Sequence, residues 1–337
     1  MNLRQGFALC VGVAAVTALP TCGGEPPDRL PTIVTRVRDA TAVSVSGGAT
    51  CVIHSDATAD CWGLVEPTAS LPSGPLPRRV ARAGVRQISM HGEKPCLLDG
   101  LGTVWCWSLG HEASPEQVSG LSEVVSISDP TMAIQKNGDV FHFCIPGGCS
   151  NPPLLVPWAH GASLVSGVCA ALAPTTFPSG GHLQCAPLAG EATISWFADR
   201  TVLALEGNYN ALALLDDGSV FCTGNSNQYE CGDGLDASAG LRQVPRIPPA
   251  IDIFDATCAK ARDGVVWCWG GARSLPVDRA RLVTCDAKFP QLCTPPIDVP
   301  ALRGAKHVAF AGDHGCAIMG DDILKCWGDN TNGQLGQ

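Results

Sequence analysis

The spacing of the cysteines constrains this chain more than any other feature of its sequence. Four cysteine pairs are separated by ten residues, and a tryptophan directly follows the second cysteine of each pair. Two alternating apolar segments lie between the paired cysteines and meet at Asp-Gly, Gly or Asp-Asp, which is typical of a β-hairpin. Opposed residues of an antiparallel pair lie about 4.5–5.5 Å apart, within the range of a disulfide. The spacing therefore predicts cross-strand disulfides: Cys51 with Cys61, Cys96 with Cys106, Cys258 with Cys268, and Cys316 with Cys326.

Three degenerate copies of the hairpin fill the gaps between these four, at residues 132–142, 169–185 and 212–222. An alternating segment precedes every hairpin, and a short segment such as RRVARAG ends the unit, so each unit is predicted to have four strands. The repeats begin at residues 51, 96, 132, 169, 212, 258 and 316, at intervals typical of propeller blades. Seven such units predict an all-β, seven-bladed β-propeller with four-stranded antiparallel blades.

The two ends of the propeller sequence complement each other. The last repeat ends CWGDNTNGQLGQ without an outgoing segment, whereas LPTIVTRVRDA, which begins at Leu30, is an outgoing segment with no repeat in front of it. We expect residues 32–37 to pair with the final hairpin and close the ring, because closure buries strand edges that are otherwise exposed. The propeller is then predicted to span residues 31–337.

The first residues predict export. One arginine precedes an apolar stretch that ends at Leu19, which is typical of a secretory signal over residues 1–21. The next residues, Leu19-Pro20-Thr21-Cys22, resemble a bacterial lipobox, so we expect Cys22 to carry lipid and residues 22–30 to form a flexible tether. The alternative is an ordinary cleaved signal. We expect an outer-membrane or cell-surface lipoprotein, otherwise a periplasmic or secreted protein, that touches a membrane through its lipid anchor alone.

The cysteine count agrees with an oxidising compartment. Sixteen cysteines remain when Cys10 in the signal and Cys22 are set aside, an even number that permits complete pairing. Beyond the four ten-residue pairs we expect four more disulfides, with the partners in the short loops less constrained: Cys169 with Cys185, Cys144 with Cys149, Cys222 with Cys231, and Cys285 with Cys293. A zinc site is the rival, but the chain has no C-x-x-C doublet.

The segment GDHGCAIMGDDILKCWGDNTNGQLG at residues 312–336 is similar to the repeat of the regulator of chromosome condensation family, and ARDGVVWCWG and DDGSVFCTGNSNQYECGDG echo it. The resemblance spans about residues 31–337 and implies a seven-bladed propeller, here of a bacterial exported or lipoprotein type. The founder of that family promotes nucleotide exchange on a nuclear GTPase, and a secreted bacterial relative inhibits an enzyme by protein contact. The matching residues build blades, so no exchange-factor residue is carried over.

No catalytic, cofactor-binding or metal-ligating residue is predicted. The chain has no G-x-S-x-G motif, and Asp216-Asp217 and Asp321-Asp322 fall where hairpin turns are expected. The segment DNTNGQLG at residues 329–336 is expected to be a turn and not a calcium loop. The tryptophans after the paired cysteines are expected to pack between blades. The eight histidines are expected to be solvated or in turns, because they are scattered: His54, His91, His111, His142, His160, His182, His307 and His314.

These patterns favour a non-catalytic, monomeric binding scaffold that engages a protein or a surface polymer. Recognition is expected in the loops at residues 63–77, 174–181 and 270–297, because insertions on a rigid scaffold are where binding residues concentrate. The net charge is −9 and no long basic run exists, which argues against a nucleic-acid partner. The alternatives are an exported propeller lyase or hydrolase with a site in the central channel, and a nucleotide-exchange factor by family analogy.

Overall fold

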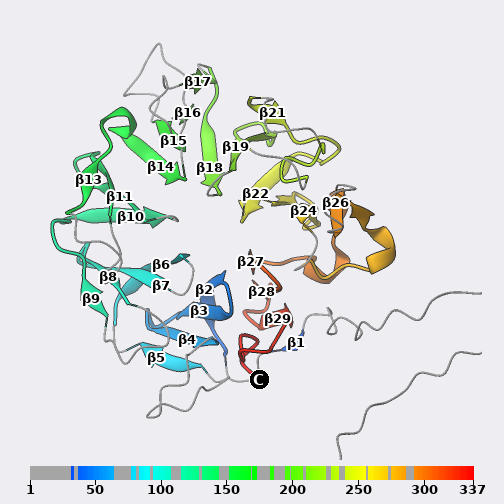
Figure 1. Ribbon diagram of the computed structural model, residues 1–337, viewed down its shortest axis with the longest axis horizontal. Helices are drawn as coiled ribbons and strands as arrows, with labels where there is room; N and C mark the ends of the chain where they lie inside the picture. The colour runs from blue at the N-terminus through cyan, green and yellow to red at the C-terminus, as the bar shows by residue number, and fades with distance from the viewer. Residues whose placement is uncertain are drawn as a thin grey trace, which may run out of the picture.

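The computed structural model describes the chain from Thr32 to Gln337 with gaps. The described residues are 32–33, 37–63, 77–80, 83–91, 94–107, 115–128, 131–143, 152–167, 169–172, 183–185, 194–197, 199–207, 210–224, 229–234, 240–255, 257–271, 275–285 and 292–337. They form seven antiparallel sheets around a central axis (Figure 1), which confirms the predicted propeller. The expected signal, Cys22 and the tether at residues 22–30 lie outside the described residues.

Each blade begins with an innermost strand beside the central channel. These strands come from the alternating segments that precede the hairpins, and their first residues are buried in every blade from the first to the sixth. In blade order they are β2 (Ala40–Ser46), β6 (Val85–His91), β10 (Val124–Ser128), β14 (Ala162–Ser166), β18 (Val202–Glu206), β22 (Ala250–Phe254) and β27 (His307–Ala311).

The second and third strands of each blade form the predicted hairpins. In blade order the second strands are β3 (Ala49–His54), β7 (Lys94–Asp99), β11 (Met132–Gln135), β15 (Cys169–Leu172), β19 (Ala211–Leu215), β23 (Cys258–Ala261) and β28 (His314–Ile318). The third strands are β4 (Ala59–Gly63), β8 (Val104–Cys106), β12 (Val140–His142), β16 (Leu183–Cys185), β20 (Val220–Thr223), β24 (Val266–Gly271) and β29 (Leu324–Gly328).

The outermost strands are short. They are β5 (Arg78–Val80), β9 (Glu116–Gln117), β13 (Leu154–Leu155), β17 (Ile194–Trp196), β21 (Arg242–Gln243) and, in the sixth blade, β26 (Leu292–Asp298). The seventh blade takes its outer strand from the other end of the chain, since β1 (Thr32–Ile33) pairs antiparallel with β29 (Figure 1). This pairing confirms the predicted closure of the ring.

The sixth blade departs from the expected four strands. An additional strand, β25 (Val283–Thr284), pairs with the outer edge of β26, so this blade has five strands. Three short 3-10 helices complete the described secondary structure: η1 (Pro157–Ala159), η2 (Arg279–Arg281) and η3 (Pro300–Leu302). No helix among the described residues is long and apolar enough to cross a membrane.

Seven disulfides join described cysteines, in the same pairs that the sequence analysis expects. Five link directly opposed residues of a hairpin, with Cα atoms 4.0–4.1 Å apart: Cys51–Cys61, Cys96–Cys106, Cys169–Cys185, Cys258–Cys268 and Cys316–Cys326. Cys222–Cys231 and Cys285–Cys293 tie the connections that follow two third strands. The expected pair Cys144–Cys149 lies outside the described residues. This density of disulfides indicates an oxidising compartment, extracellular or periplasmic.

A separate apolar cluster fills each of the seven interfaces between neighbouring blades. The residue that directly follows the second disulfide position of a hairpin packs against the preceding blade. In four interfaces it is a buried tryptophan: Trp62, Trp107, Trp269 and Trp327. Phe143 takes the same place between the second and third blades, although its hairpin has Met132 and His142 instead of cysteines. The tryptophans are therefore core residues, as predicted.

Candidate binding face

The chain direction divides the propeller into two faces. Within each blade the turn between the second and third strands lies at the end where the innermost strand begins, because Ala40 at the start of β2 pairs with His54 at the end of β3. We call this end the turn face. The opposite end, where the third strand leaves toward the outermost one, is the loop face. Every blade shares this arrangement, since the innermost strands run the same way along the channel.

Backbone hydrogen bonds join neighbouring blades on the turn face. The carbonyl of Gly102 accepts the N–H of Val124 in the next blade at 3.0 Å, and the same contact recurs from Ala57, Gly138, Gly218 and Gly264 to the blade that follows each. These turn residues have positive φ. A Cβ on Gly218 would lie 2.8 Å from the carbonyl oxygen of Ala250, so glycine permits the close approach. The turn face is therefore a rigid surface.

A set of bulged residues, one in each of the first six blades, lies near the start of the innermost strands on this face, and we call it the bulged ring. The pairing of the innermost and second strands shifts by one residue at the same place in the first six blades. A bulge leaves one residue outside the ladder and redirects its side chain. The bulged residues are Thr41, Arg86, Val125, Ser163, Leu203 and Ile251, and Lys306 precedes β27 at the corresponding place in the seventh blade.

Three members of this ring are apolar and exposed. Val125, Leu203 and Ile251 expose 42%, 56% and 51% of their area, respectively. They come from the third, fifth and sixth blades, and the small Ser163 of the fourth blade lies between them in ring order. We call Val125, Leu203 and Ile251 the apolar arc. Leu101, in the turn of the second blade, is 88% exposed on the same face. Exposed apolar residues from several blades on one face indicate a contact surface.

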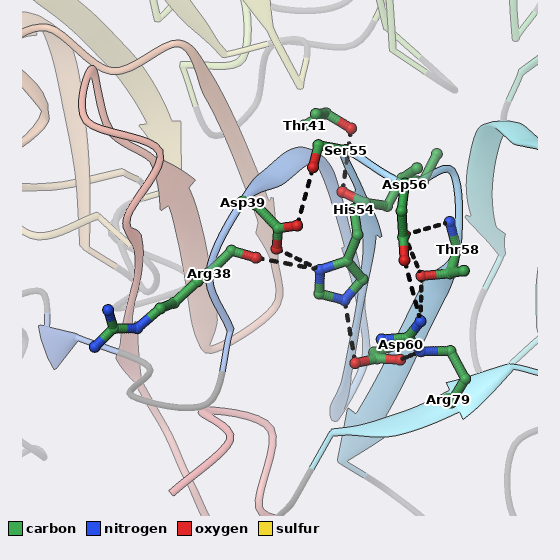
Figure 2. A network of polar contacts seen from close by, with 10 residues as sticks. Arg38, Asp39, Thr41, His54, Ser55, Asp56, Thr58, Asp60 and Arg79 are labelled. Carbon is green, nitrogen blue, oxygen red and sulfur yellow. Dashed lines mark hydrogen bonds and ion pairs between the residues drawn. The ribbon is translucent and has the colours of Figure 1, made fainter.

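His54 is the centre of a polar network on the turn face of the first blade (Figure 2). Its Nδ1 lies 3.0 Å from Oδ1 of Asp39 and 3.2 Å from the carbonyl oxygen of Arg38, and its Nε2 lies 3.1 Å from Oδ2 of Asp60. Burial alone would lower the pKa of His54, but the hydrogen bonds to Asp39 and to the Arg38 carbonyl and the charge of Asp60 outweigh it, so the pKa is raised. The imidazole is thus held between two carboxylates in a form that favours a proton.

The rest of the network orders the neighbouring turn. Arg79 Nε donates to Asp60 Oδ1 at 2.6 Å, and Asp56 accepts both the N–H and the hydroxyl of Thr58 (Figure 2). Ser55 Oγ donates to Asp39 Oδ2 at 3.0 Å and not to His54. A serine hydrolase needs the serine on the imidazole, so this Ser, His and Asp combination supports structure rather than nucleophilic attack.

The opposite end of the channel carries carboxyl groups. Glu206 ends β18, and Asp252 and Asp255 lie in and just after β22 of the next blade. Glu206 is exposed at the surface, and crowding by the surrounding protein together with Asp255 and Asp252 raises its pKa to about 8. Asp255 accepts the N–H of Phe310. Carboxyl groups of the fifth and sixth blades thus gather at the loop-face ends of the innermost strands.

The expected turns are present. Asp217 accepts the N–H of Ser219 at 2.8 Å and pairs with Arg200, as Asp216 does, so this acidic pair serves the turn. Asp322 pairs with Lys306 at 2.6 Å. The segment at residues 329–336 is a turn in which Asp329 accepts from Thr331 and Gln334.

The prediction for the histidines was wrong at three positions. His54 and His314 are buried, at 6% and 0% exposure, because each lies in a polar network that the scattered sequence positions do not reveal. His307 is half-buried and lies in the strand β27, not in a turn. His142 and His160 are exposed as expected. His111 and His182 lie outside the described residues.

The loops expected to bind are partly described. Residues 174–181 and most of 63–77 lie outside the described residues. The connection at residues 270–297 is more regular than expected, since it holds η2, β25, most of β26 and the Cys285–Cys293 disulfide. The sequence analysis did not predict the bulged ring. The signal that could have found it is position, because each bulged residue directly follows the buried first residue of its innermost strand.

Comparisons with known proteins agree with this architecture. Residues 305–334 match the family model described as the regulator of chromosome condensation (RCC1) repeat. The E3 ubiquitin-protein ligase HERC2 of Homo sapiens and that of Mus musculus are each 29% identical over 133 residues, which covers 37% of this chain and 3% of the relative. The chain thus spans a small part of those relatives.

Among solved structures, yeast RCC1 (Prp20) bound to Kap60 superposes with a TM-score of 0.55 at 15% identity, covering 96% of this chain and 88% of that one. This likeness concerns the fold alone. The chain is a seven-bladed propeller with disulfides inside its blades, and its last repeat is similar to the RCC1 repeat.

Proposed function

We propose that this chain is an exported, non-catalytic scaffold of the cell envelope that binds another protein or a surface polymer through a propeller face. The observation that carries the proposal is the rigid turn face, where blades joined by backbone hydrogen bonds present apolar side chains to solvent. Rigid apolar surface on an otherwise well-packed protein favours association over solvation. The disulfides support an extracytoplasmic site of action.

The proposal includes a lipid anchor at Cys22 of a bacterial lipoprotein, otherwise a soluble periplasmic or secreted form. Intact mass of the protein from its native envelope tests this, with alkylation before and after reduction. We expect an acylated chain that begins at Cys22 and alkylates at sixteen cysteines after reduction and at none before it. An unprocessed chain with free thiols contradicts both export and the scaffold.

Binding itself is tested by site-specific photocrosslinking in the native cells. A photoreactive residue at Leu203 reports on the turn face, and one at Val283, exposed in the connection of the sixth blade, reports on the loop face. We expect a discrete crosslinked partner at one of the two positions. Absence of any crosslink from either face, with export intact, argues against a binding scaffold.

A channel enzyme is the second candidate, and Glu206 is the observation that favours it. A carboxyl group with a pKa of about 8 is protonated at neutral pH and suits general acid chemistry. His307 of the seventh blade, whose pKa burial lowers, lies in the same channel wall with its ring 6.1 Å from that of Phe254. Turnover of a defined glycan or ester that Glu206→Gln abolishes, while crosslinking at Leu203 persists, would favour the enzyme.

Nucleotide exchange is a third candidate and follows from the repeat alone. Its test is stimulated release of a labelled guanine nucleotide from a small GTPase. We expect no stimulation, because disulfides favour an oxidising compartment and the proposed export removes this protein from cytoplasmic GTPases.

A further inference from the structure

We infer that the turn face docks a protein segment that presents apolar side chains to the apolar arc and carboxylates to neighbouring arginines. This inference rests on the proposed binding function and names the face and the chemistry of the partner. Its first support is the ring itself. The same structural position is apolar in the third, fifth and sixth blades and polar or charged in the others, so one side of the turn face carries the exposed apolar residues.

Burial of the apolar arc by a partner is favourable because each side chain keeps about half of its area in water. Bulges hold these side chains out of the sheet, and they cannot withdraw into the blade interfaces, whose cores are filled by other residues. Aliphatic side chains of this kind contact leucine or phenylalanine of a partner well. Sugar rings prefer flat aromatic platforms, so a protein segment is favoured over a neutral polysaccharide.

Three arginines border the sixth-blade end of the apolar arc. Arg246 and Arg303 are exposed in the connections that lead into β22 and β27, and Arg262 is exposed in the turn between β23 and β24. Gly304 N–H donates to the carbonyl of Gly264 at 2.9 Å, which places the Arg262 turn against the Arg303 connection. Within the described part of the chain, no ion pair engages these guanidinium groups.

Most carboxylates of this face are already engaged. Asp263, beside Arg262, accepts the N–H of Val265 at 3.0 Å, and Asp216, Asp217 and Asp322 are ion-paired within their own blades. Asp263 keeps its negative charge when it accepts an N–H, and the three arginines outnumber it, so a local positive excess remains on a chain whose net charge is −9. A partner with carboxylates next to its apolar side chain complements this arrangement, and guanidinium groups bind carboxylates with two hydrogen bonds.

The first described strand runs toward the turn face. Thr32 pairs with Cys326 and Ile33 with Lys325 of the antiparallel β29, so β1 begins at its loop-face end.

The test uses the oxidised, full-length mature protein and a displayed library of random short linear peptides without cysteine. We expect enriched peptides to combine leucine or phenylalanine with aspartate or glutamate. Leu203→Ser/Ile251→Ser is expected to raise the dissociation constant of a synthetic enriched peptide by about tenfold or more, as measured by fluorescence anisotropy. Arg262→Ser/Arg303→Ser is expected to weaken it by a similar factor and to reduce the salt dependence of binding.

The matched control is Leu154→Ser/Leu155→Ser, which removes apolar side chains of 58% and 50% exposure from β13, at the outer rim of the third blade. Peptide binding should survive this change. Failure to enrich peptides, or equal loss in the control, overturns the inference. Polyphosphate binding that needs the arginines but not Leu203 and Ile251 would instead identify an anionic polymer as the ligand. Crosslinking at Val283 but not at Leu203 would leave the scaffold function standing and reject this face.

Discussion

The interface that closes the ring and the interface between the third and fourth blades are built from the same hairpin but differ in what holds them. At the closing interface Trp62 is buried, and its Nε1 donates to the carbonyl oxygen of Gln334 at 2.9 Å. Thr50 Oγ1 donates its proton to the same carbonyl at 2.9 Å and lies 3.1 Å from His314 Nε2. His314 Nε2–H must therefore be the donor in the contact with Thr50. A large aromatic side chain and a buried polar network act together there.

The interface between the third and fourth blades has neither feature. Its cluster consists of alanine, valine, leucine, isoleucine and methionine side chains, with the half-buried Trp158 at its edge. The hairpin of the third blade has Met132 opposite His142 where five of the other blades have a disulfide. The comparison teaches that stability is concentrated where the two ends of the chain meet. A closed ring needs this, because opening there exposes strand edges on both sides.

The largest expected effect is at Trp62. Trp62→Ala removes a fully packed side chain and leaves the Gln334 carbonyl with one donor fewer, so we expect a loss of about 3–5 kcal/mol in the free energy of unfolding. Chemical denaturation measures this. Trp158→Ala at the third interface is the control and should cost less than half as much. Equal losses would show that the two interfaces do not differ in the proposed way.

Removing the last disulfide should come next. Cys316→Ala/Cys326→Ala frees the hairpin that carries the closing interface, and by the chain-entropy argument we expect a loss of about 2–4 kcal/mol. The hairpin is expected to persist, because the register of β28 and β29 extends beyond the cysteines from His314 to Leu324. Thermal unfolding with circular dichroism checks both points. An unchanged melting temperature would mean that packing alone closes the ring.

The converse change sharpens the comparison. Met132→Cys/His142→Cys places cysteines at directly opposed positions of β11 and β12, in the register of the other hairpin disulfides. We expect a gain of about 2 kcal/mol and slower amide hydrogen exchange in the third blade. Met132→Ser/His142→Ser serves as the control without a bond. No gain after verified oxidation would indicate that the third blade is not a weak point.

The smallest expected effect is a pH dependence of the free energy of unfolding, which comes from His314 at the closing interface. Burial lowers the pKa of His314 to about 4 from an ordinary value of 6.5. The unfolded chain therefore binds more protons between these values, so stability is complete above pH 6.5 and falls as the pH drops toward 4. We expect a loss of about 2 kcal/mol from pH 7 to pH 5. His314→Gln should flatten this dependence, whereas the exposed His142→Gln should leave it.

Protonation of His54 is expected to change the stability in the opposite direction to protonation of His314. Its raised pKa means that protonation favours the folded state, so its contribution is full below pH 6.5 and is lost as the pH rises through the raised value. Asp39, Asp60 and Arg79 are the charged groups around it. His54→Gln should therefore remove the gain in stability that appears as the pH falls through the raised pKa toward 6.5, and should leave the loss below pH 6.5 unchanged. A His54→Gln variant that keeps the gain above pH 6.5 would contradict the assignment of His54 and His314 to opposite signs.

Much of the architecture was predictable because its signals are local. A ten-residue spacing with a turn between the cysteines defines a hairpin without reference to any distant residue, and the seven innermost strands follow from alternating segments close by. The candidate binding face was less accessible. Exposure of Leu203 and Ile251 depends on a bulge and on what the neighbouring blades cover, and alternation alone predicts neither.

The amino-acid order alone defined the hairpins, the cysteine pairs, the number of blades and the strand that closes the ring, because each depends on short-range spacing. The tertiary structure decided which side chains become solvent-free and which surround the channel. His314 illustrates the reason. Its partner Thr50 is 264 residues away in the chain, so the burial that lowers its pKa comes from a contact that ring closure creates. Pairwise burial across blades is a property of the closed ring, and no local pattern encodes it.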